Sequence, residues 1–397
     1  MKQWLFQPPE LIHLHRTHMV AALHSPAQQR LAQIEQMRRT VIAEGRSAAG
    51  MLMNEWSDRS WIERSWRRCL EAGQRPEHRL TFDLVPAQAR RRTEEANHAL
   101  LKAAKPLLDK LGRAIANSHY FAILTDPQGV VIDYNGPIDT SDQRARLLAR
   151  VGVDLSEQAV GTTAIGAVLA ELRPVWLHRA EHFFNDTAVF SCAGAPLFGP
   201  DGRCAGMLDL TGIEVSERPE LKHLVAQWAR SIENSLALAQ PHALLLRLNW
   251  PGCNLGEDGD GLVGLDRDGN VVAVNTAARQ MLAQLVSGPQ RPHCSELFAM
   301  PWELLFDAAR RDRAVEVPLW SGLTLQVLAQ SPGGPASAVA AANGPALGYE
   351  RPLPLPLRDV EAALIRKAVD EAHGNVKEAA QRLGISRATV YRKLGRR

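Results

Sequence analysis

A proline- and glycine-rich segment divides the chain near its C-terminal end. Residues 331–357, SPGGPASAVAAANGPALGYERPLPLPL, contain six prolines and four glycines and show no helical or strand periodicity. This composition is typical of a linker, flexible at first and stiffer at PLPLP, because proline has no amide hydrogen to donate and glycine loses the most backbone entropy on folding. Residues 358–397 must therefore fold by themselves. The 397-residue chain, 45% hydrophobic, has enough apolar material for further domains before the linker.

The residues after the linker predict short helices joined by a glycine turn. An amphipathic helix is expected over 358–372, and Asn375 is placed to cap the next helix, VKEAAQRL. Gly384 permits the left-handed residue of a sharp turn, and Ser386 can cap a last helix, RATVYRKL. Small or apolar side chains supply the core: Ala380, Leu383, Ile385, Val390 and Leu394. This pattern predicts an all-α helix-turn-helix.

The same region concentrates positive charge. Residues 374–397 carry seven Lys/Arg against one Asp/Glu, in a chain with a net charge of only +3. A recognition helix presents its first residues to base edges in the major groove, where arginine pairs with guanine while other groups contact phosphate. The alternative is a basic, solvated helix pair without a partner, but the turn, cap and core positions together favour double-stranded DNA. The predicted DNA-contacting residues are Asn375, Ser386, Arg387, Thr389, Tyr391, Arg392 and Lys393.

The segment GNVKEAAQRLGISRATVYRKL resembles the Fis-type helix-turn-helix that closes many bacterial enhancer-binding activators. The resemblance implies a homodimer, because such domains bind pseudo-palindromic DNA through paired helices. The helix over 358–372 is the expected dimer contact.

Strand-turn-strand patterns occupy the middle of the chain. YFAILTDPQGVVIDYNG turns at Asp126–Gly129, and APLFGPDGRCAGMLDLTG turns at Gly199–Gly202. Helical patterns at 56–73, 86–118 and 217–238 surround them, so we expect an α+β domain whose antiparallel sheet is covered on one side. A third unit, GLVGLDRDGNVVAVN, leads into the helix TAARQMLAQL, capped by Asn275 or Thr276. With AVEVPLW and LTLQVLAQ as further strands, it predicts a second, smaller α+β domain.

Six motifs occur in an order that resembles the N-terminal region of acetoin-catabolism-type regulators, whose centre is a GAF domain. They are RSWRRCLEAGQRPE, LTDPQGVV, SEQAVGTTAIGAVL, RPVWLHRAEHF, CAGAPLFGPDGRCAGMLDLTG and SIENSLAL, within about residues 50–240. The resemblance implies a multidomain α+β protein with a GAF-type antiparallel sheet and flanking helices. The expected domains are a helical leader over 1–85, a GAF-like sensor over 86–240, a small PAS-like unit over 250–330, a linker over 331–357 and a helix-turn-helix over 358–397.

The GAF resemblance implies a small-molecule effector. The candidate ligand-binding residues are Thr162, Thr163, His182, Cys192 and Asp209. Each has a plainer interpretation: a loop histidine is commonly held by a neighbouring carbonyl group, and a strand cysteine is commonly a small core residue. Trp56, Trp61 and Trp66 are expected to pack the leader against the sheet instead of forming a binding cage.

The phosphate-binding sequence of an ATPase is missing from this chain. The motif GxxxxGK[ST] needs a Gly-Lys pair, which occurs nowhere, and the loop GAFTGA is also absent. We therefore predict a regulator that binds DNA without remodelling sigma-54 polymerase by ATP hydrolysis, and no enzyme activity. RNA polymerase is a further candidate partner. Two alternatives stay open: a GAF-based thiol redox enzyme using Cys192 or Cys204, and a heterodimer partner of an ATPase-bearing relative.

Cysteine spacing and hydropathy argue against disulfides, a zinc site, a membrane span and a secretory signal. The five cysteines include no CxxC pair, so neither a disulfide framework nor a thiolate zinc site is expected, and no metal or cofactor is predicted. No apolar run approaches the ~18 residues of a membrane span. The start MKQWLFQPPE lacks the apolar stretch of a secretory signal, so we expect no membrane partner and a cytoplasmic protein.

Overall fold

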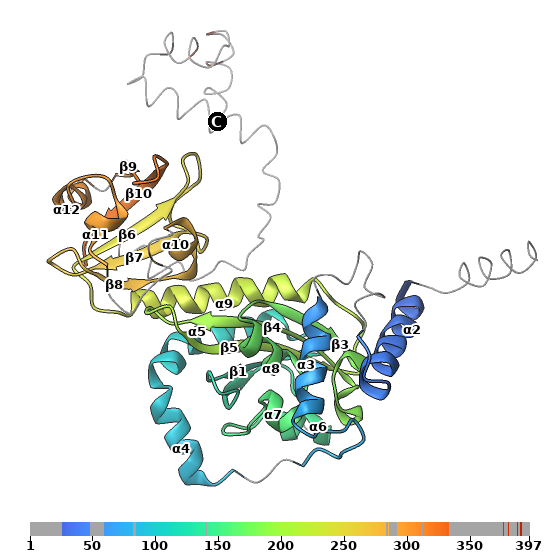
Figure 1. The fold of residues 1–397 in the computed structure, drawn as a ribbon. Coiled ribbons are helices and arrows are strands. Elements are labelled where there is room, and N and C mark those ends of the chain that lie inside the picture. Colours follow the sequence, from blue (N-terminus) through green and yellow to red (C-terminus); the bar gives the residue numbers. More distant parts are fainter. Residues whose placement is uncertain are drawn as a thin grey trace, which may run out of the picture. The chain divides into compact units, whose positions relative to one another are not determined.

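The protein is described by a computed structural model, which divides into one unit over Met1–Gly344 and another over Pro345–Arg397 (Figure 1). The described residues are 26–47, 59–81, 85–139, 141–282, 285, 292–311 and 313–332, together with Val376, Ala380, Arg387 and Val390. Among the helices in these ranges, none has the length and apolar content needed to cross a membrane.

The N-terminal helices pack directly on the first sheet unit. They are α2 (Pro26–Arg38), which continues as a π-helical turn over Arg39–Ala43, and α3 (Ser60–Glu71). Trp61 and Trp66 are buried in one core cluster with residues of the first sheet, as expected for packing residues. Trp56 lies outside the described residues.

The first sheet has five antiparallel strands in the order β2-β1-β5-β4-β3. The strands are β1 (Tyr120–Thr125), β2 (Val131–Asn135), β3 (Val175–His178), β4 (Phe190–Phe198) and β5 (Cys204–Ile213). Both predicted turns form, since the Gly129 amide donates to the Asp126 carbonyl (3.1 Å) and the Gly202 amide to the Gly199 carbonyl (2.8 Å).

Helices cover this sheet on both faces, so the expectation of cover on one side is wrong. Helices α5 (His98–Ala114) and α9 (Leu221–Leu238) pack on the face that includes Ala193 of β4. Cys192, its neighbour, points into a second core on the opposite face. The long connection between β2 and β3 forms that cover together with α3. Its helices are α6 (Gln143–Leu148), α7 (Glu157–Val160) and α8 (Ala164–Glu171). A further helix, α4 (Ala87–Ala96), precedes α5.

A second five-stranded antiparallel sheet follows, in the order β8-β7-β6-β10-β9. Its strands are β6 (Leu244–Asn249), β7 (Gly261–Leu265), β8 (Val271–Val274), β9 (Val315–Pro318) and β10 (Thr324–Gln330). Its helices are α10 (Thr276–Met281), α11 (Cys294–Leu297) and α12 (Glu303–Ala309). The sequence patterns missed the central strand β6, which begins before the range 250–330 predicted for this domain.

Asn275 joins this second sheet to α9. Its side-chain oxygen caps α10 by accepting from the Ala278 amide (2.9 Å), as predicted. Its side-chain nitrogen donates to the side chain of Asn234 on α9 (2.8 Å) and to the carbonyl of Asp260 (2.8 Å). The side chain is 2% exposed, so one buried amide holds two elements of the fold together.

The C-terminal unit is described at four helical positions. Ala380 and Val390 are buried, as the predicted core requires, and Arg387 is exposed. The other predicted DNA-contacting residues lie outside the described part of the chain: Asn375, Ser386, Thr389, Tyr391, Arg392 and Lys393.

Candidate functional site

A cavity of about 30 Å³ lies between the first sheet and the helices of the β2–β3 connection. Four of the five predicted ligand-binding residues line it: Thr163, His182, Cys192 and Asp209. The remaining lining residues are mainly apolar and include Ile123, Leu148, Leu155, Val160, Ala164, Ile165 and Phe190, with Thr187 and Thr211. The cavity is an apolar chamber with a small number of polar groups.

His182, one of the lining residues, has a ring nitrogen without a partner among the described residues. The residue is fully buried, and its Nδ1 lies 2.9 Å from the carbonyl oxygen of Arg179. A carbonyl oxygen only accepts, so Nδ1 carries the hydrogen. Burial lowers the pKa of His182 to about 4, which keeps the ring neutral at pH 7. Nε2 is therefore an acceptor, and no atom of the described residues donates to it.

The loop that carries His182 is held by the N-terminal helices. Arg38 of α2 donates to the carbonyl oxygens of Ala180, His182 and Phe183. The indole nitrogen of Trp66 on α3 donates to the carbonyl of Glu181 (2.9 Å). The predicted leader thus positions a cavity residue that lies more than a hundred residues further along the chain.

Asp209, another lining residue, has one carboxyl oxygen without a partner among the described residues. The side chain is fully buried on β5, and Thr211 donates its hydroxyl hydrogen to Oδ2. Oδ1 has no partner among the described residues. Burial raises the pKa of Asp209 to about 7, because no cation offsets the cost of the buried charge. The carboxyl group can therefore be found with or without its proton near neutral pH.

Cys192 completes the polar side of the cavity. Its sulfur lies 3.4 Å from the Thr211 hydroxyl oxygen, and the side chain is 6% exposed. Burial, followed by the nearby charge of Asp209, raises the pKa of this thiol well above its ordinary value. The group is a buried neutral thiol, unlike the exposed thiolates of redox enzymes.

The two neighbouring threonines separate in the structure. Thr163 lines the cavity and accepts from the Gly166 amide (3.3 Å) as the cap of α8. The Thr162 hydroxyl faces α3, where it lies 2.7 Å from the Ser65 hydroxyl. Thr211 was missed by the sequence analysis, although side chains two apart on a strand share a face and so place it beside Asp209.

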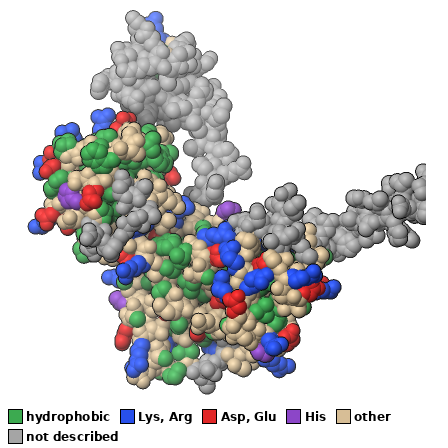
Figure 2. Space-filling model, viewed as in Figure 1, with side chains coloured by type: hydrophobic (Ala, Val, Ile, Leu, Met, Phe, Trp, Pro, Cys, Tyr) green, Lys and Arg blue, Asp and Glu red, His purple; other side chains and the backbone are tan. Residues whose placement is uncertain are grey.

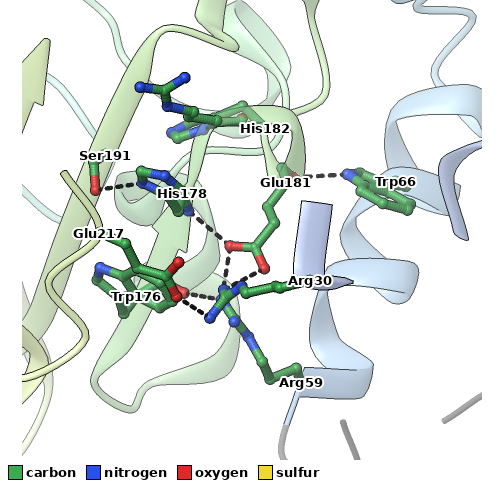
Figure 3. Close-up of polar contacts among 10 residues, drawn as sticks. Arg30, Arg59, Trp66, Trp176, His178, Glu181, His182, Ser191 and Glu217 are labelled. Atoms are coloured by element: carbon green, nitrogen blue, oxygen red, sulfur yellow. Dashed lines mark hydrogen bonds and ion pairs between the residues drawn. The ribbon is translucent and has the colours of Figure 1, made fainter. Parts of the chain in front are cut away.

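A buried ion-pair network lies next to the cavity loop (Figure 3). Glu181, fully buried, accepts from Arg59 (2.7 Å) and from Arg30 (2.9 Å), and it also accepts from the His178 backbone amide (2.7 Å). Both guanidinium groups lie over the Trp176 ring, at 4.4 Å for Arg30 and 4.9 Å for Arg59. This network fixes α2 and the start of α3 to the end of β3.

Charges of both signs gather on the surface over α2 and α3, as Figure 2 shows. The arginines there form ion pairs with acidic neighbours: Arg59 with Glu181, Arg64 with Glu171, Arg67 with Glu63 and Arg68 with Glu157. This face therefore differs in its balance of charge from residues 374–397, which carry seven Lys/Arg and one Asp/Glu.

No metal centre is evident within the described ranges, where His, Cys, Asp and Glu nowhere gather in groups of three or more suited to holding an ion. The five cysteines are all free.

Comparison with known families finds a match in each of two regions of the chain. Residues 46–234 match the N-terminal domain of MimR, and residues 356–396 match the Fis family of bacterial regulatory proteins. Over these two regions the chain is similar to a MimR N-terminal domain and to a Fis-type regulatory domain. The resemblance to acetoin-catabolism regulators is thereby confirmed, and the chain has the DNA-binding and sensor domains of transcriptional regulators.

Several transcriptional regulators are similar to part of this chain. The acetoin catabolism regulatory protein of Cupriavidus necator is 29% identical over 63% of this chain and 38% of its own length. The activator AcoR of the Bacillus subtilis acetoin dehydrogenase operon is 28% identical over 47% of this chain and 31% of its own length. The propane 2-monooxygenase operon activator MimR of Mycolicibacterium smegmatis is 29% identical over 45% of this chain and 30% of its own length. The chain thus spans well under half the length of each relative.

Among solved structures, a chain of the Escherichia coli DhaR(N)–DhaL complex is 17% identical. It covers 68% of this chain and 99% of its own, with a TM-score of 0.42.

Proposed function

We propose that this chain is a transcriptional regulator whose first sheet unit binds a small effector and whose Fis-type domain binds double-stranded DNA. The observation that supports effector binding is the apolar cavity, two of whose lining residues, His182 and Asp209, each carry a buried polar atom (Nε2 and Oδ1) without a partner among the described residues. Unsatisfied buried polar atoms are costly, so two of them on residues that line an apolar cavity favour a ligand with matching groups.

The effector acts, in this proposal, by shifting the protein between two states with different affinity for DNA or for a partner. A homodimer built through the Fis-type domain would match the two-fold symmetry of its DNA site. RNA polymerase is a candidate partner, and the chain would work in the cytoplasm.

ATP hydrolysis has no part in the proposed mechanism, because the chain has no Gly-Lys pair for a phosphate loop. The thiol redox alternative is disfavoured by Cys192, since a buried thiol with a raised pKa is a poor nucleophile. Heterodimerisation with an ATPase-bearing relative is compatible with the same domains, and the mass of a mixture on size exclusion would detect it.

DNA binding is tested with the full chain and an Arg387→Ala, Arg392→Ala double variant. Genomic fragments retained by the wild type but not by the variant would support the regulator and give the half-site spacing. A steep salt dependence without preferred fragments would mean that the basic segment binds DNA only nonspecifically. A folded protein that binds no fragment would contradict the proposal.

A further inference from the structure

The cavity over the first sheet has little room unless one of its walls moves. A volume of about 30 Å³ holds about two water-sized probes, so a ligand of more than a few non-hydrogen atoms needs it to widen. Two walls are firmly bound: β1, β4 and β5 each pair on both sides, and the helices of the β2–β3 connection bury apolar side chains against them. The third wall is the His182 loop, residues 179–187, which contributes His182 and Thr187 to the lining.

The His182 loop has no strand or α-helix of its own. Its regular structure is two short 3₁₀ turns, Arg179–Glu181 and Asn185–Thr187. Arg179 has a φ of 50°, in the left-handed region that is costly for any residue with a side chain. Such a conformation persists only where surrounding contacts hold it. The shape of the loop therefore depends on contacts made to it from outside.

A single arginine supplies three of these contacts. Arg38, the last residue of α2, donates from Nη1 to the carbonyl oxygens of Ala180 (3.0 Å) and His182, and from Nη2 to that of Phe183 (2.9 Å). Its Cζ atom lies 5.6 Å from the centre of the Trp66 ring on α3. Hydrogen bonds from a charged donor are stronger than neutral ones, so this guanidinium group holds the loop carbonyls in place.

Helix α2 contacts the loop along one face. Arg30, Ile34 and Arg38 follow one another at intervals of four residues and so share that face. Ile34 is fully buried in the core that also contains cavity residues, and Arg30 forms an ion pair with Glu181 of the loop. Displacement of α2 would therefore remove the contacts of Arg30 and Arg38 with the loop together.

We propose that α2 is a strap over the His182 loop, and that release of Arg38 from the loop carbonyls opens the cavity to solvent and to ligands. The regulatory role of this opening rests on the proposed effector function. Arg38 is a positioning residue, because it acts on the cavity through the loop and is not itself a lining residue. Its release frees the strained turn at Arg179, and the cavity closes when Arg38 binds the carbonyls again.

Helix α6 is the competing way into the cavity. Leu148 of α6 lines the cavity, and Arg144 ties this helix to Glu214 after β5 (2.9 Å) as well as to its own cap, Asp142 (2.7 Å). Arg144 thus fastens a different wall through a comparable side chain. Its removal provides the matched control for removal of Arg38.

The thiol of Cys192 reports opening without any ligand. Cys192 lines the cavity, is buried and has a pKa raised well above its ordinary value by that burial, so the closed protein should react slowly with iodoacetamide. The full chain is labelled at pH 8, and the modified peptides are quantified by mass spectrometry. Cys294, buried in the core of the second sheet, is the internal reference.

Arg38→Met removes the donors and keeps an unbranched side chain beside Trp66. We expect it to raise the labelling rate of Cys192 about ten- to a hundredfold, as the loss of charged hydrogen bonds allows, and to leave the rate of Cys294 unchanged. Arg144→Met should change the Cys192 rate by less than about fivefold, because its ion pairs are exposed. Urea below the unfolding transition should accelerate the Cys192 reaction only slightly, because local opening exposes little surface.

Each of three results would overturn the inference. An unchanged Cys192 rate in Arg38→Met would mean that the strap does not control access. An equal or larger increase in Arg144→Met would assign the opening to α6. Joint acceleration of Cys192 and Cys294, with a steep dependence on urea, would mean that Arg38→Met only destabilises the whole fold. No ligand enters these measurements, so the strap can fail while the effector function stands, and the strap can stand if no effector exists.

Discussion

The two sheets of the larger unit share two features of strand pairing, although their strand orders differ, β2-β1-β5-β4-β3 in the first and β8-β7-β6-β10-β9 in the second. In each, the first and last strands pair at the centre, β1 with β5 and β6 with β10. In each, the two edge strands are joined by a helical connection, from β2 to β3 and from β8 to β9. In each case the connecting helices pack over one face of the sheet, and the interior between the two is here called its chamber. Figure 1 shows these helices beside their sheets.

The two chambers are filled differently. The core over the second sheet packs apolar side chains such as Leu282, Phe298 and Leu305 from its helices. The chamber over the first sheet contains His182 and Asp209 and keeps about 30 Å³ open. Topology determines where a chamber forms, but the side chains determine whether it is a core or a site.

The largest effect is expected from Glu181→Gln, which tests whether the first chamber depends on the N-terminal helices. The substitution leaves Arg59 and Arg30 without their buried carboxylate, so the free energy of unfolding should fall by about 3–5 kcal/mol. Urea denaturation followed by circular dichroism measures it. The matched control is Asp307→Asn, which breaks an exposed pair with Arg310 and should cost less than about 1 kcal/mol. Equal effects would refute the anchoring role.

The second sheet should respond to a loss of apolar packing. Leu305→Ala removes a fully buried side chain and should lower the free energy of unfolding by about 2–5 kcal/mol. Its neighbour Leu304 is 49% exposed on the same helix, so Leu304→Ala should change stability by about 0.5 kcal/mol or less. Urea denaturation followed by circular dichroism measures both effects, and equal effects of the two substitutions would contradict the burial of Leu305 in the second core.

Asn275→Ala tests the connection between the two sheets. It removes the cap of α10 and the side-chain hydrogen bonds to Asn234 and Asp260. We therefore expect the free energy of unfolding, measured by heat or urea, to fall by about 1–3 kcal/mol. Asn275→Ser retains a capping oxygen without the amide donors and should fall between the wild type and the alanine variant. A serine variant as unstable as the alanine variant would mean that the cap contributes nothing.

The smallest change is expected in the pH dependence of stability, because two contributions oppose each other. Asp209, with a folded pKa raised from 3.8 to about 7, retains its proton when the unfolded chain has lost it, so its contribution to stability falls between pH 4 and 7. His182, with a folded pKa lowered from 6.5 to about 4, binds fewer protons folded than unfolded, so its contribution rises between pH 4 and 6.5.

Single substitutions should expose each contribution. Relative to the wild type, Asp209→Asn should become more stable as pH rises from 4 to 7, and His182→Phe should become less stable as pH rises from 4 to 6.5. Urea titrations at each pH provide the comparison. Parallel pH curves for all three proteins would contradict the buried, unpaired state of both residues.

Local sequence signals predicted much of the fold. The turns at Asp126–Gly129 and Gly199–Gly202 and the Asn275 cap formed as expected, because they depend on residues within a few positions of one another. Strand β6 was missed, since LLLRLN has no turn residue or clear alternation to distinguish it from a loop or a helix.

The candidate site was predicted only as a set of residues. Sequence motifs identified Thr163, His182, Cys192 and Asp209, all of which line one cavity. They did not identify Thr211, or Arg38 as the residue that holds the His182 loop, because these contacts join segments that are distant along the chain.

The sequence by itself determined the two family resemblances, the basic Fis-type segment and the local turns, because composition and short-range spacing carry that information. Only the tertiary structure decided that the first sheet is covered on both faces and that His182 and Asp209 share one chamber. It also decided which of their atoms stay unsatisfied. The physical reason is that burial, pKa and hydrogen-bond satisfaction depend on which distant side chains exclude water from a group, and such neighbours are fixed by packing.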